Sequence, residues 1–434
     1  MIWFFYNLLF PLVFLLVLPR FLFRMRKRGG YRDRFSQRFG LYEPAIRARL
    51  DGEPRVWIHA VSVGEMLVAL QFIQAYRARH PGARFVLSTV TSTGRAMALK
   101  QADPLDVVLY FPLDFPPIVR RALAAIRPRM LILTEGELWP NLLRQCRDRG
   151  IPAVVINGRM SVKSSRGYRL LGPFTRAALG CVNKIYAQSD GDRQRCLMLG
   201  TAPDRVEVLG AVKYDAEAEP GAAARVESVL KQTWGEAERL ILLGGSTWPQ
   251  EETALGECYK RLRAAHPALR LVLVPRHFER AKAVAEELDR LGLTFIRRSE
   301  LGKTALASPP DVLLVDTTGE LKSFYAAADV VFVGKSLYDN RGGQNFIEPA
   351  LFGKPVLTGP HVENFPGIEE DFRKADAFLQ VADAEELTAQ VNRLLRDPAA
   401  REGYGRRALE LIARRRGVMS VTVDRIGALL GDQP

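Results

Sequence analysis

The stretch RVWIHAVSVGEM, residues 55–66, places a short apolar run directly before a segment with helical spacing. Its β-branched and aromatic residues predict a buried strand, and the small residues that follow predict a tight turn into a helix. A strand, a turn and a helix form the repeating unit of α/β folds. The turn ends on an acid, Glu65. This acid either suits the positive end of the helix dipole or is held at the strand end for chemistry.

The same pattern repeats along the chain in two series. The predicted strands of the first series are RVWIHAV, ARFVLSTVT, VVLYFPL, MLILTEGE, AVVINGR, KIYAQSD and VEVLGAV. Those of the second series are RLILLGGS, LRLVLVPR, LTFIRR, VLLVDT, VVFVGKS, PVLTGP and AFLQVA. Alternating strands and helices predict an α/β fold with parallel sheets covered on both faces, here as two doubly wound, Rossmann-like domains. The predicted domains are residues 26–215 and 238–396, with a polar linker at 216–237 and a helical tail at 397–434.

The N-terminus differs from the rest of the chain. Met1 to Pro19 contains no charged side chain, and roughly 20 apolar residues suffice to cross a hydrocarbon core. Basic residues follow it, whereas a signal peptide carries its positive charge before the apolar run. We therefore expect an uncleaved membrane anchor at residues 1–25, spanning the bilayer or lying in its interface. The positive-inside rule then places the remaining chain in the cytoplasm.

The formal net charge of +14 and the sequence pI near 9.8 predict a polyanionic partner. Anionic lipid, a phosphorylated substrate and nucleic acid all fit this charge, but the basic residues are not interleaved with aromatic ones as in a nucleic-acid reader. The four cysteines lie far apart without a CxxC pair, which argues against a disulfide framework or a zinc site. We expect free thiols in a reducing compartment.

The predicted strand ends of the second series indicate nucleotide binding. Ser246 follows two glycines, Arg276 and His277 follow LVLVP, and Thr318, Gly319 and Glu320 follow VLLVDT. In NRGGQNFIEPALFGKPVLTGPH, Glu348 is placed to accept hydrogen bonds from ribose hydroxyls. Its structural alternative is a capping-box acid that answers Asn345, three residues earlier.

Two strand ends of the first series carry charge. Glu135 and Glu137 end the run MLILTEGE, and Lys213 follows VEVLGAV. Glu135 is either held for chemistry or paired internally, and Lys213 could neutralise a leaving phosphate or a donor carboxylate. The acids Asp190 and Asp192 resemble a metal-binding pattern, but they open a predicted helix, where acids cap the amides. No metal site is predicted.

Taken together, the motifs HAVSVGE, TEGELWP, NGRMS, GAVKYD, LVPRHFER, DTTGEL and GGQNFIEPALFGKPVLTGPH resemble the Kdo transferases of lipopolysaccharide synthesis over nearly the whole chain. The resemblance implies a GT-B glycosyltransferase fold. It also implies transfer of 3-deoxy-D-manno-oct-2-ulosonic acid (Kdo) from CMP-Kdo to a lipid A precursor, with inversion and without a metal or other cofactor. The expected location is the cytoplasmic face of the bacterial inner membrane.

Carried over by position, the resemblance implies that Glu65 is the general base and that Glu135 and Lys213 assist the transition state. The residues it assigns to CMP are Arg276, His277, Thr318, Gly319, Glu320, Asn345, Phe346, Ile347 and Glu348, and Ser246 joins them on its place at the strand end. The chain departs from the family at Trp248, Lys335 and Gln344, where His, Gly and His are frequent. Two alternatives stay open: another CMP-activated 2-keto sugar acid as donor, and a membrane-associated nucleotide- or lipid-binding protein without activity.

Overall fold

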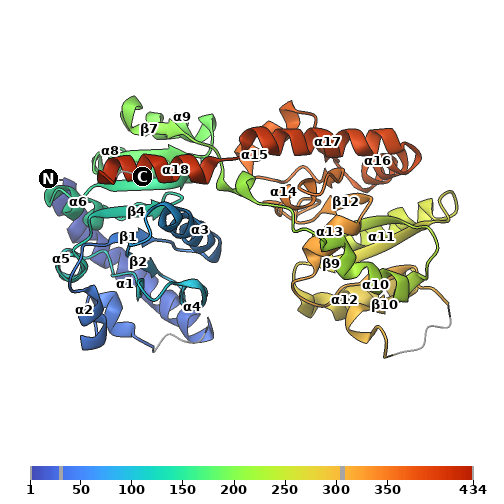
Figure 1. Ribbon diagram of the computed structural model, residues 1–434, viewed down its shortest axis with the longest axis horizontal. Coiled ribbons are helices and arrows are strands. Elements are labelled where there is room, and N and C mark those ends of the chain that lie inside the picture. The colour runs from blue at the N-terminus through green and yellow to red at the C-terminus, as the bar shows by residue number, and fades with distance from the viewer. Residues whose placement is uncertain (1, 29–32, 304–307, 433–434) are drawn as a thin grey trace. The chain divides into compact units, whose positions relative to one another are not determined.

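The apolar runs form two parallel sheets, one in each of two units of the chain (Figure 1). The computed structural model describes residues 2–28, 33–303 and 308–432. Unit 1 comprises Met1–Val212 and Gly417–Pro434, and unit 2 comprises Lys213–Arg416. Each unit has one seven-stranded sheet with helices on both sides, so the predicted α/β class is confirmed.

The sheet of unit 1 has the order β3-β2-β1-β4-β5-β6-β7, with every neighbouring pair parallel. The strands are β1 (Val56–His59), β2 (Phe85–Thr89), β3 (Val107–Tyr110), β4 (Met130–Thr134), β5 (Ala153–Gly158), β6 (Lys184–Ala187) and β7 (Val206–Val208). Strands β1 to β5 are buried throughout, as expected of parallel strands covered on both faces.

The helices of unit 1 cover the two faces of this sheet. They are α1 (Ile2–Arg28), η1 (Phe35–Phe39), α2 (Pro44–Leu50), α3 (Val63–Arg79), α4 (Ser92–Gln101), α5 (Pro116–Ile126), α6 (Pro140–Asp148), α7 (Val162–Leu170), α8 (Gly172–Leu179), α9 (Asp190–Met198), η2 (Pro203–Arg205) and α18 (Val418–Leu430). Helices α3 and α18 pack together in the core on one face, whereas α5 and α6 contribute to the core on the other. Figure 1 shows α18, in red, with the elements of unit 1.

The sheet of unit 2 has the order β10-β11-β9-β8-β12-β13-β14, again all parallel. Its strands are β8 (Leu240–Thr247), β9 (Leu269–Pro275), β10 (Phe295–Arg297), β11 (Val312–Leu314), β12 (Val330–Val333), β13 (Val356–Thr358) and β14 (Leu379–Gln380). Its helices are α10 (Ala222–Trp234), α11 (Glu251–Leu262), η4 (Phe278–Arg280), α12 (Ala281–Arg290), η5 (Arg298–Glu300), α13 (Leu321–Ala327), α14 (Ile347–Ala350), α15 (Pro366–Lys374), α16 (Ala384–Arg396) and α17 (Pro398–Arg415). The short helix η3 (Val212–Asp215) lies at the boundary between the units.

Both sheets reverse their strand order at one place. In unit 1 the reversal lies between β1 and β4, where His59 is in register with Leu133. In unit 2 it lies between β8 and β12, where Gly245 is in register with Val333. At such a reversal, the segments that follow the two neighbouring strands run to opposite sides of the sheet. A crevice therefore opens at the carboxyl ends of these strands, and ligands bind there in this class of fold.

The structure divides the chain differently from the predicted domain limits. Residues 216–237, expected to be a linker, contain α10, and its Val226, Leu230 and Trp234 are buried. The expected tail at 397–434 is indeed helical, but α17 belongs to unit 2 and α18 to unit 1. The apolar residues of α10 are interspersed with alanine and polar residues. This mixed composition is also typical of linkers, which is why a linker was predicted here.

The apolar N-terminus forms α1, which contains Pro11 and Pro19. Within the described residues, no helix is both long enough and apolar enough to pass through a membrane. All four cysteines are buried free thiols, in agreement with the sequence analysis.

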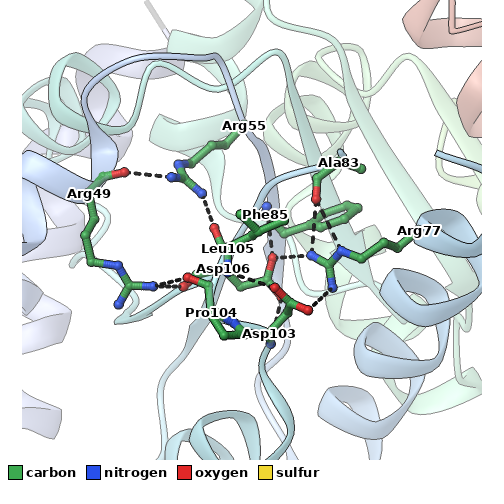
Figure 2. Close-up of polar contacts among 9 residues, drawn as sticks. All are labelled: Arg49, Arg55, Arg77, Ala83, Phe85, Asp103, Pro104, Leu105 and Asp106. Carbon is green, nitrogen blue, oxygen red and sulfur yellow. Dashed lines mark hydrogen bonds and ion pairs between the residues drawn. The ribbon is translucent and has the colours of Figure 1, made fainter. Parts of the chain in front are cut away.

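The amino-terminal edge of the unit 1 sheet is held by a buried ion pair (Figure 2). Arg77 donates to Asp106 Oδ1 at 2.6 Å, and the Asp106 side chain is only 1% exposed. The backbone N–H of Phe85 donates to the same oxygen at 3.2 Å, so Asp106 ties the start of β3 to the start of β2. Arg55 and Arg49 donate to backbone carbonyls of the 104–106 turn. This arginine-rich edge is therefore structural, and it lies at the opposite end of the strands from the crevice.

Replacing Arg77 by Met is expected to lower the free energy of unfolding of unit 1 by about 3–5 kcal/mol, because the buried Asp106 carboxylate loses its cation. Arg84→Met is the matched control, since its partner Glu53 has a side chain 74% exposed and such pairs contribute about 0–1 kcal/mol. The free energy of unfolding of both variants is measured by hydrogen exchange of peptides from β2 and β3 at increasing urea concentrations. Equal losses in the two variants would contradict a structural role for the Arg77–Asp106 pair.

Candidate functional site

Glu65 lies in the first turn of α3, which follows β1 at the crevice of unit 1. Ser62 caps α3 by accepting a hydrogen bond from Glu65 N at 3.2 Å, and Glu65 Oε1 accepts from Ser62 N at 3.3 Å. Glu65 Oε2 accepts from Val61 N at 2.9 Å and from Thr134 Oγ1 at 3.2 Å. Glu65 is therefore a first-turn acid, as one of the two interpretations expected, and it also completes a capping box with Ser62. The Thr134 bond goes further, because it fixes the carboxylate against the end of β4, the neighbouring strand at the reversal.

The loop after β4 brings Glu135 to the same place in a strained backbone conformation. Glu135 has φ = 64°, a left-handed value that is uncommon for residues other than glycine. The carbonyl of Glu135 accepts from Arg159 N at 2.7 Å, and a Cβ added to Gly136 would lie 3.1 Å from Arg159 O. The loop after β5 thus holds the loop after β4 at close range. Strained backbone of this kind is concentrated at functional sites.

Glu137 is the residue of this site that the sequence analysis underrated. Partial burial of its carboxyl group, together with the nearby charges of Glu65 and Glu135, raises the pKa of Glu137 to about 7. The residue itself remains exposed to solvent. Three carboxyl groups therefore gather at the reversal of the sheet, and a perturbed acid in such a crevice is a candidate for proton transfer. The available signal was the Glu-x-Glu spacing directly after a buried strand.

Aromatic rings close the site on its inner side. His59 is buried and stacks on Phe111 with ring centroids 3.7 Å apart, and Trp139 contacts both rings. Burial lowers the pKa of His59 to about 3, while its Nδ1 lies 3.0 Å from the Ser88 carbonyl. His59 is therefore neutral and structural, although it stands in the most characteristic motif of the chain.

Glu251 organises the reversal of the sheet in unit 2. The strand predicted through Ser246 is present as β8, which extends to Thr247, and α11 begins at Glu251. The buried Glu251 carboxylate accepts four backbone N–H groups, from Trp248, Lys335, Ser336 and Leu337, at 2.8–3.0 Å. These amides are consequently occupied by a residue of the chain. The sequence analysis did not single out Glu251.

Two of the three departures from the family pattern touch each other at this reversal. Lys335 Nζ lies 5.0 Å from the centroid of the Trp248 ring, within the range of a cation–π contact. Lys335 has φ = 60°, a left-handed conformation in which glycine is unstrained. His277, which follows β9 with the exposed Arg276, packs edge-on against Trp248 at 5.6 Å. Trp248 and His277 therefore form one surface at the ends of β8 and β9.

The predicted group at Thr318, Gly319 and Glu320 is only partly available. Thr318 and Gly319 are exposed, and Gly319 has φ = 89°. Glu320 pairs with Arg298 at 3.1 Å and accepts a short hydrogen bond from Thr317, so its carboxylate is held within the chain.

Asn345 and Glu348 form a partly buried polar pair. Asn345 Nδ2 donates to Glu348 Oε1 at 3.1 Å, whereas α14 starts at Ile347 without a side-chain cap, so the capping-box alternative is wrong. Asn345 Oδ1 is buried and receives no hydrogen bond from the residues that the structure describes. Burial raises the pKa of Glu348, and the charges of Lys322, Arg276 and Lys213 oppose this rise.

Phe346 and Ile347 lie between Asn345 and Glu348 in the sequence, and their side chains belong to the core. Phe346 and Ile347 are fully buried, and Phe346 stacks on Phe378 at 5.4 Å. They position the loop through packing.

Lys213 belongs to unit 2, whereas Glu65 and Glu135, with which the resemblance groups it, belong to unit 1. Its Nζ is 4.8 Å from the centroid of the Phe365 ring, and its charge acts on Glu348. Glu65, Glu135 and Glu137 come together in unit 1, and Lys213 joins Arg276 and Glu348 in unit 2.

The acid pair at Asp190 and Asp192 opens α9, as the sequence analysis expected. Asp192 is buried and accepts from Met160 N at 2.9 Å and from Arg195 at 3.0 Å.

Glu137→Gln is expected to flatten the pH dependence of stability. Because the pKa of folded Glu137 lies at about 7, above its ordinary value of 4.5, its contribution to stability is present at low pH and is lost as pH rises through about 7. The thermal midpoint of the variant should therefore fall less between pH 5 and pH 8 than that of the unmodified protein. Glu286→Gln, at an exposed position of α12, is the control. Parallel curves for all three proteins would contradict the clustering of the acids.

Comparison with known proteins agrees with this arrangement. A family model described as 3-deoxy-D-manno-octulosonic-acid transferase (kdotransferase) matches residues 33–216. The solved structure of Anabaena HepE in complex with UDP has a TM-score of 0.60 at 16% identity and covers 87% of this chain and 100% of its own. That of UDP-GlcNAc 2-epimerase from Neisseria meningitidis has a TM-score of 0.58 at 13% identity, covering 86% and 99%. These two show the fold, which resembles that of GT-B glycosyltransferases.

The full-length relatives are closer in sequence. The 3-deoxy-D-manno-octulosonic acid transferase of Haemophilus influenzae is 32% identical and covers 92% of each chain. The enzyme of the same name from Bordetella pertussis is 36% identical and covers 94% of this chain and 95% of its own. An identity of this size over almost the entire length means that the chain belongs to the 3-deoxy-D-manno-octulosonic acid transferase family of glycosyltransferases.

Proposed function

We propose that the protein transfers Kdo from CMP-Kdo to a lipid A precursor, with inversion, in lipopolysaccharide synthesis. The observation that carries the proposal is the group of three carboxyl groups at the reversal of the unit 1 sheet, in a chain of the Kdo transferase family. A sugar hydroxyl is a poor nucleophile at neutral pH, and an acid within hydrogen-bond reach can remove its proton. The acids of unit 1 would serve the acceptor, and the cations of unit 2 would serve the donor.

Glu65 is the proposed general base. It takes the proton of the acceptor hydroxyl while that oxygen bonds to the anomeric carbon of Kdo and the phosphate of CMP leaves with the bonding electron pair. The bonds from Val61 N, Ser62 N and Thr134 Oγ1 support this role, because they fix the carboxylate before the substrate arrives. Glu137, exposed and with a pKa of about 7, is the competing candidate for the same proton.

Glu65→Gln is expected to lower kcat by about 10²- to 10⁴-fold, the usual contribution of a positioned base, in an assay with CMP-Kdo and lipid IVA. Ser62→Ala is the matched control for the capping role, since loss of a cap costs about 1 kcal/mol of stability and leaves the acid in place. If Glu137→Gln abolishes turnover while Glu65→Gln retains it with an intact fold, the base has been assigned to the wrong acid.

The donor is proposed to bind unit 2 through Asn345 and Glu348. The buried Asn345 Oδ1 and the Glu348 carboxylate are suited to accept hydrogen bonds from the two ribose hydroxyls of CMP. Arg276 and Lys213, whose charges act on Glu348, are suited to the phosphate and to the Kdo carboxylate. Because these side chains supply the positive charge that the leaving group needs, we propose a transfer that requires no metal ion.

Glu348→Gln is expected to weaken CMP binding by about 10-fold or more, because a hydrogen bond to a charged acceptor contributes about 1.5–3 kcal/mol. Isothermal titration calorimetry with CMP measures the change. Glu370→Gln is the control, since Glu370 pairs with Lys374 on the exposed side of α15. An unchanged dissociation constant for Glu348→Gln would remove this residue from the donor site.

The lipid acceptor implies a membrane surface, and α1 is suited to meet one. Phe4, Leu8, Leu12 and Leu16 are exposed, Leu16 by 82%. The opposite side of the helix packs on unit 1 through Tyr6, Phe10 and Phe14, which contact Phe174 and Phe115. Because one apolar side of α1 packs on unit 1 and the other is exposed, the exposed side is suited to lie in the lipid of a membrane interface. We propose that the protein acts at the cytoplasmic face of the bacterial inner membrane, and the exposed apolar side of α1 supports attachment to a membrane surface.

A further inference from the structure

Asp114 connects α1 with the acidic loop of the site. It is 2% exposed, and its carboxylate caps the N-terminus of α6: Oδ2 accepts from Asn141 N and Oδ1 from Leu142 N, both at 2.9 Å. Two backbone N–H groups that have no partner within the helix are satisfied in this way. Burial raises the pKa of Asp114 to about 7, and its three hydrogen-bond donors oppose that rise.

The helix α1 supplies the third donor and a second contact. Tyr6 OH donates to Asp114 Oδ2 at 3.3 Å. Asn141 Nδ2 donates to Asn7 Oδ1 at 2.8 Å and also to the carbonyl of Asp114. Two consecutive residues of α1 therefore reach the buried N-terminus of α6. Apolar packing against unit 1 would be enough for a helix that served only as a tether. The hydrogen bonds of Tyr6 and Asn7 additionally fix one position of α1 on unit 1.

The N-terminus of α6 is also the end of the acidic loop. Pro140, its first residue, comes three positions after Glu137. Trp139 lies between Glu137 and Pro140 in the sequence, and its ring centroid is 4.5 Å from that of Phe111. Phe111 in turn precedes Asp114 by three residues. The loop from Glu135 to Trp139 is thus anchored at one end by β4 and at the other by the Asp114 cap.

We propose that α1 is a positioning element of the active site: through Tyr6 and Asn7 it sets the Asp114 cap of α6, and through that cap the placement of Glu135 and Glu137. The catalytic half of this inference rests on the proposed function. Seating of α1 on unit 1 then governs the chemical step as well as the attachment of the protein to lipid. The acidic loop is in its working position when α1 is docked.

The test compares the double variant Tyr6→Phe/Asn7→Ala with Leu16→Ser, a matched change on the exposed side of α1. Hydrogen exchange at the amides of Asn141 and Leu142 is the first readout and needs no activity. The double variant should exchange about 3- to 10-fold faster there, the effect of one or two lost hydrogen bonds, and Leu16→Ser should not. Leu16→Ser should instead reduce binding to vesicles of phosphatidylethanolamine and phosphatidylglycerol.

Transfer from CMP-Kdo to lipid IVA in detergent micelles is the second readout, because attachment to a bilayer is irrelevant there. The double variant should lose about 3- to 10-fold in kcat with little change in KM for lipid IVA, whereas Leu16→Ser should keep kcat at saturating lipid IVA. Unchanged exchange and unchanged kcat in the double variant would overturn the proposal and leave α1 as a tether. If the unmodified protein transfers no Kdo, the proposed function fails, while the exchange readout still tests the coupling. Tyr6→Phe alone, which removes one hydroxyl, provides the same test should the double variant fail to fold.

Discussion

The register of β1 beside β4 is the constraint on which unit 1 depends. These strands run parallel with His59 opposite Leu133, so the segments that follow them leave the sheet at the same edge and point away from each other. Thr134 Oγ1 bridges the two ends by donating to Glu65 Oε2. A slip of one residue would turn Thr134 toward the opposite face and remove this bond. The placement of three acids side by side is therefore a property of sheet pairing more than of any loop.

Unit 2 uses the same geometry with the opposite chemistry. At its reversal a buried carboxylate, Glu251, satisfies four backbone N–H groups and thereby fixes the ends of β8 and β12 together. The side chains around it are Trp248, Lys335 and His277, which pack on one another. One unit therefore presents carboxyl groups at its crevice, and the other presents cations and aromatic rings. This division suits an acceptor that must lose a proton and a donor that must lose an anion.

Much of the fold could be predicted from the sequence because most of the strands are short apolar runs, rich in β-branched residues, that are buried on both faces. The place of Glu65 in the first turn of a helix followed from its position after the strand and the small residues, and the helix at Asp190 followed from its acids. Glu137 was visible in its Glu-x-Glu spacing, but its raised pKa and the bonds of Glu251 depend on burial and on which strands are neighbours, and spacing along the chain does not encode those. Lys213 was expected in the first domain because it follows the last strand of unit 1, but it belongs to unit 2, where it packs on Phe365. Phe346 and Ile347 stood inside a binding motif, yet their burial makes them core residues.

The return of α18 to unit 1 has a consequence for biosynthesis. Val418, Val423 and Ile426 belong to the core around α3, so unit 1 is discontinuous in sequence, whereas unit 2 is one continuous segment. The chain enters and leaves unit 2 at one place, where Arg416 donates to the carbonyl of Ala216. On the ribosome, unit 2 can complete its core before unit 1 does, because the last helix of unit 1 emerges after all of unit 2. Until α18 has been synthesised, the core residues of α3 lack the helix that packs on them, so unit 1 can complete its core only after unit 2 has been made.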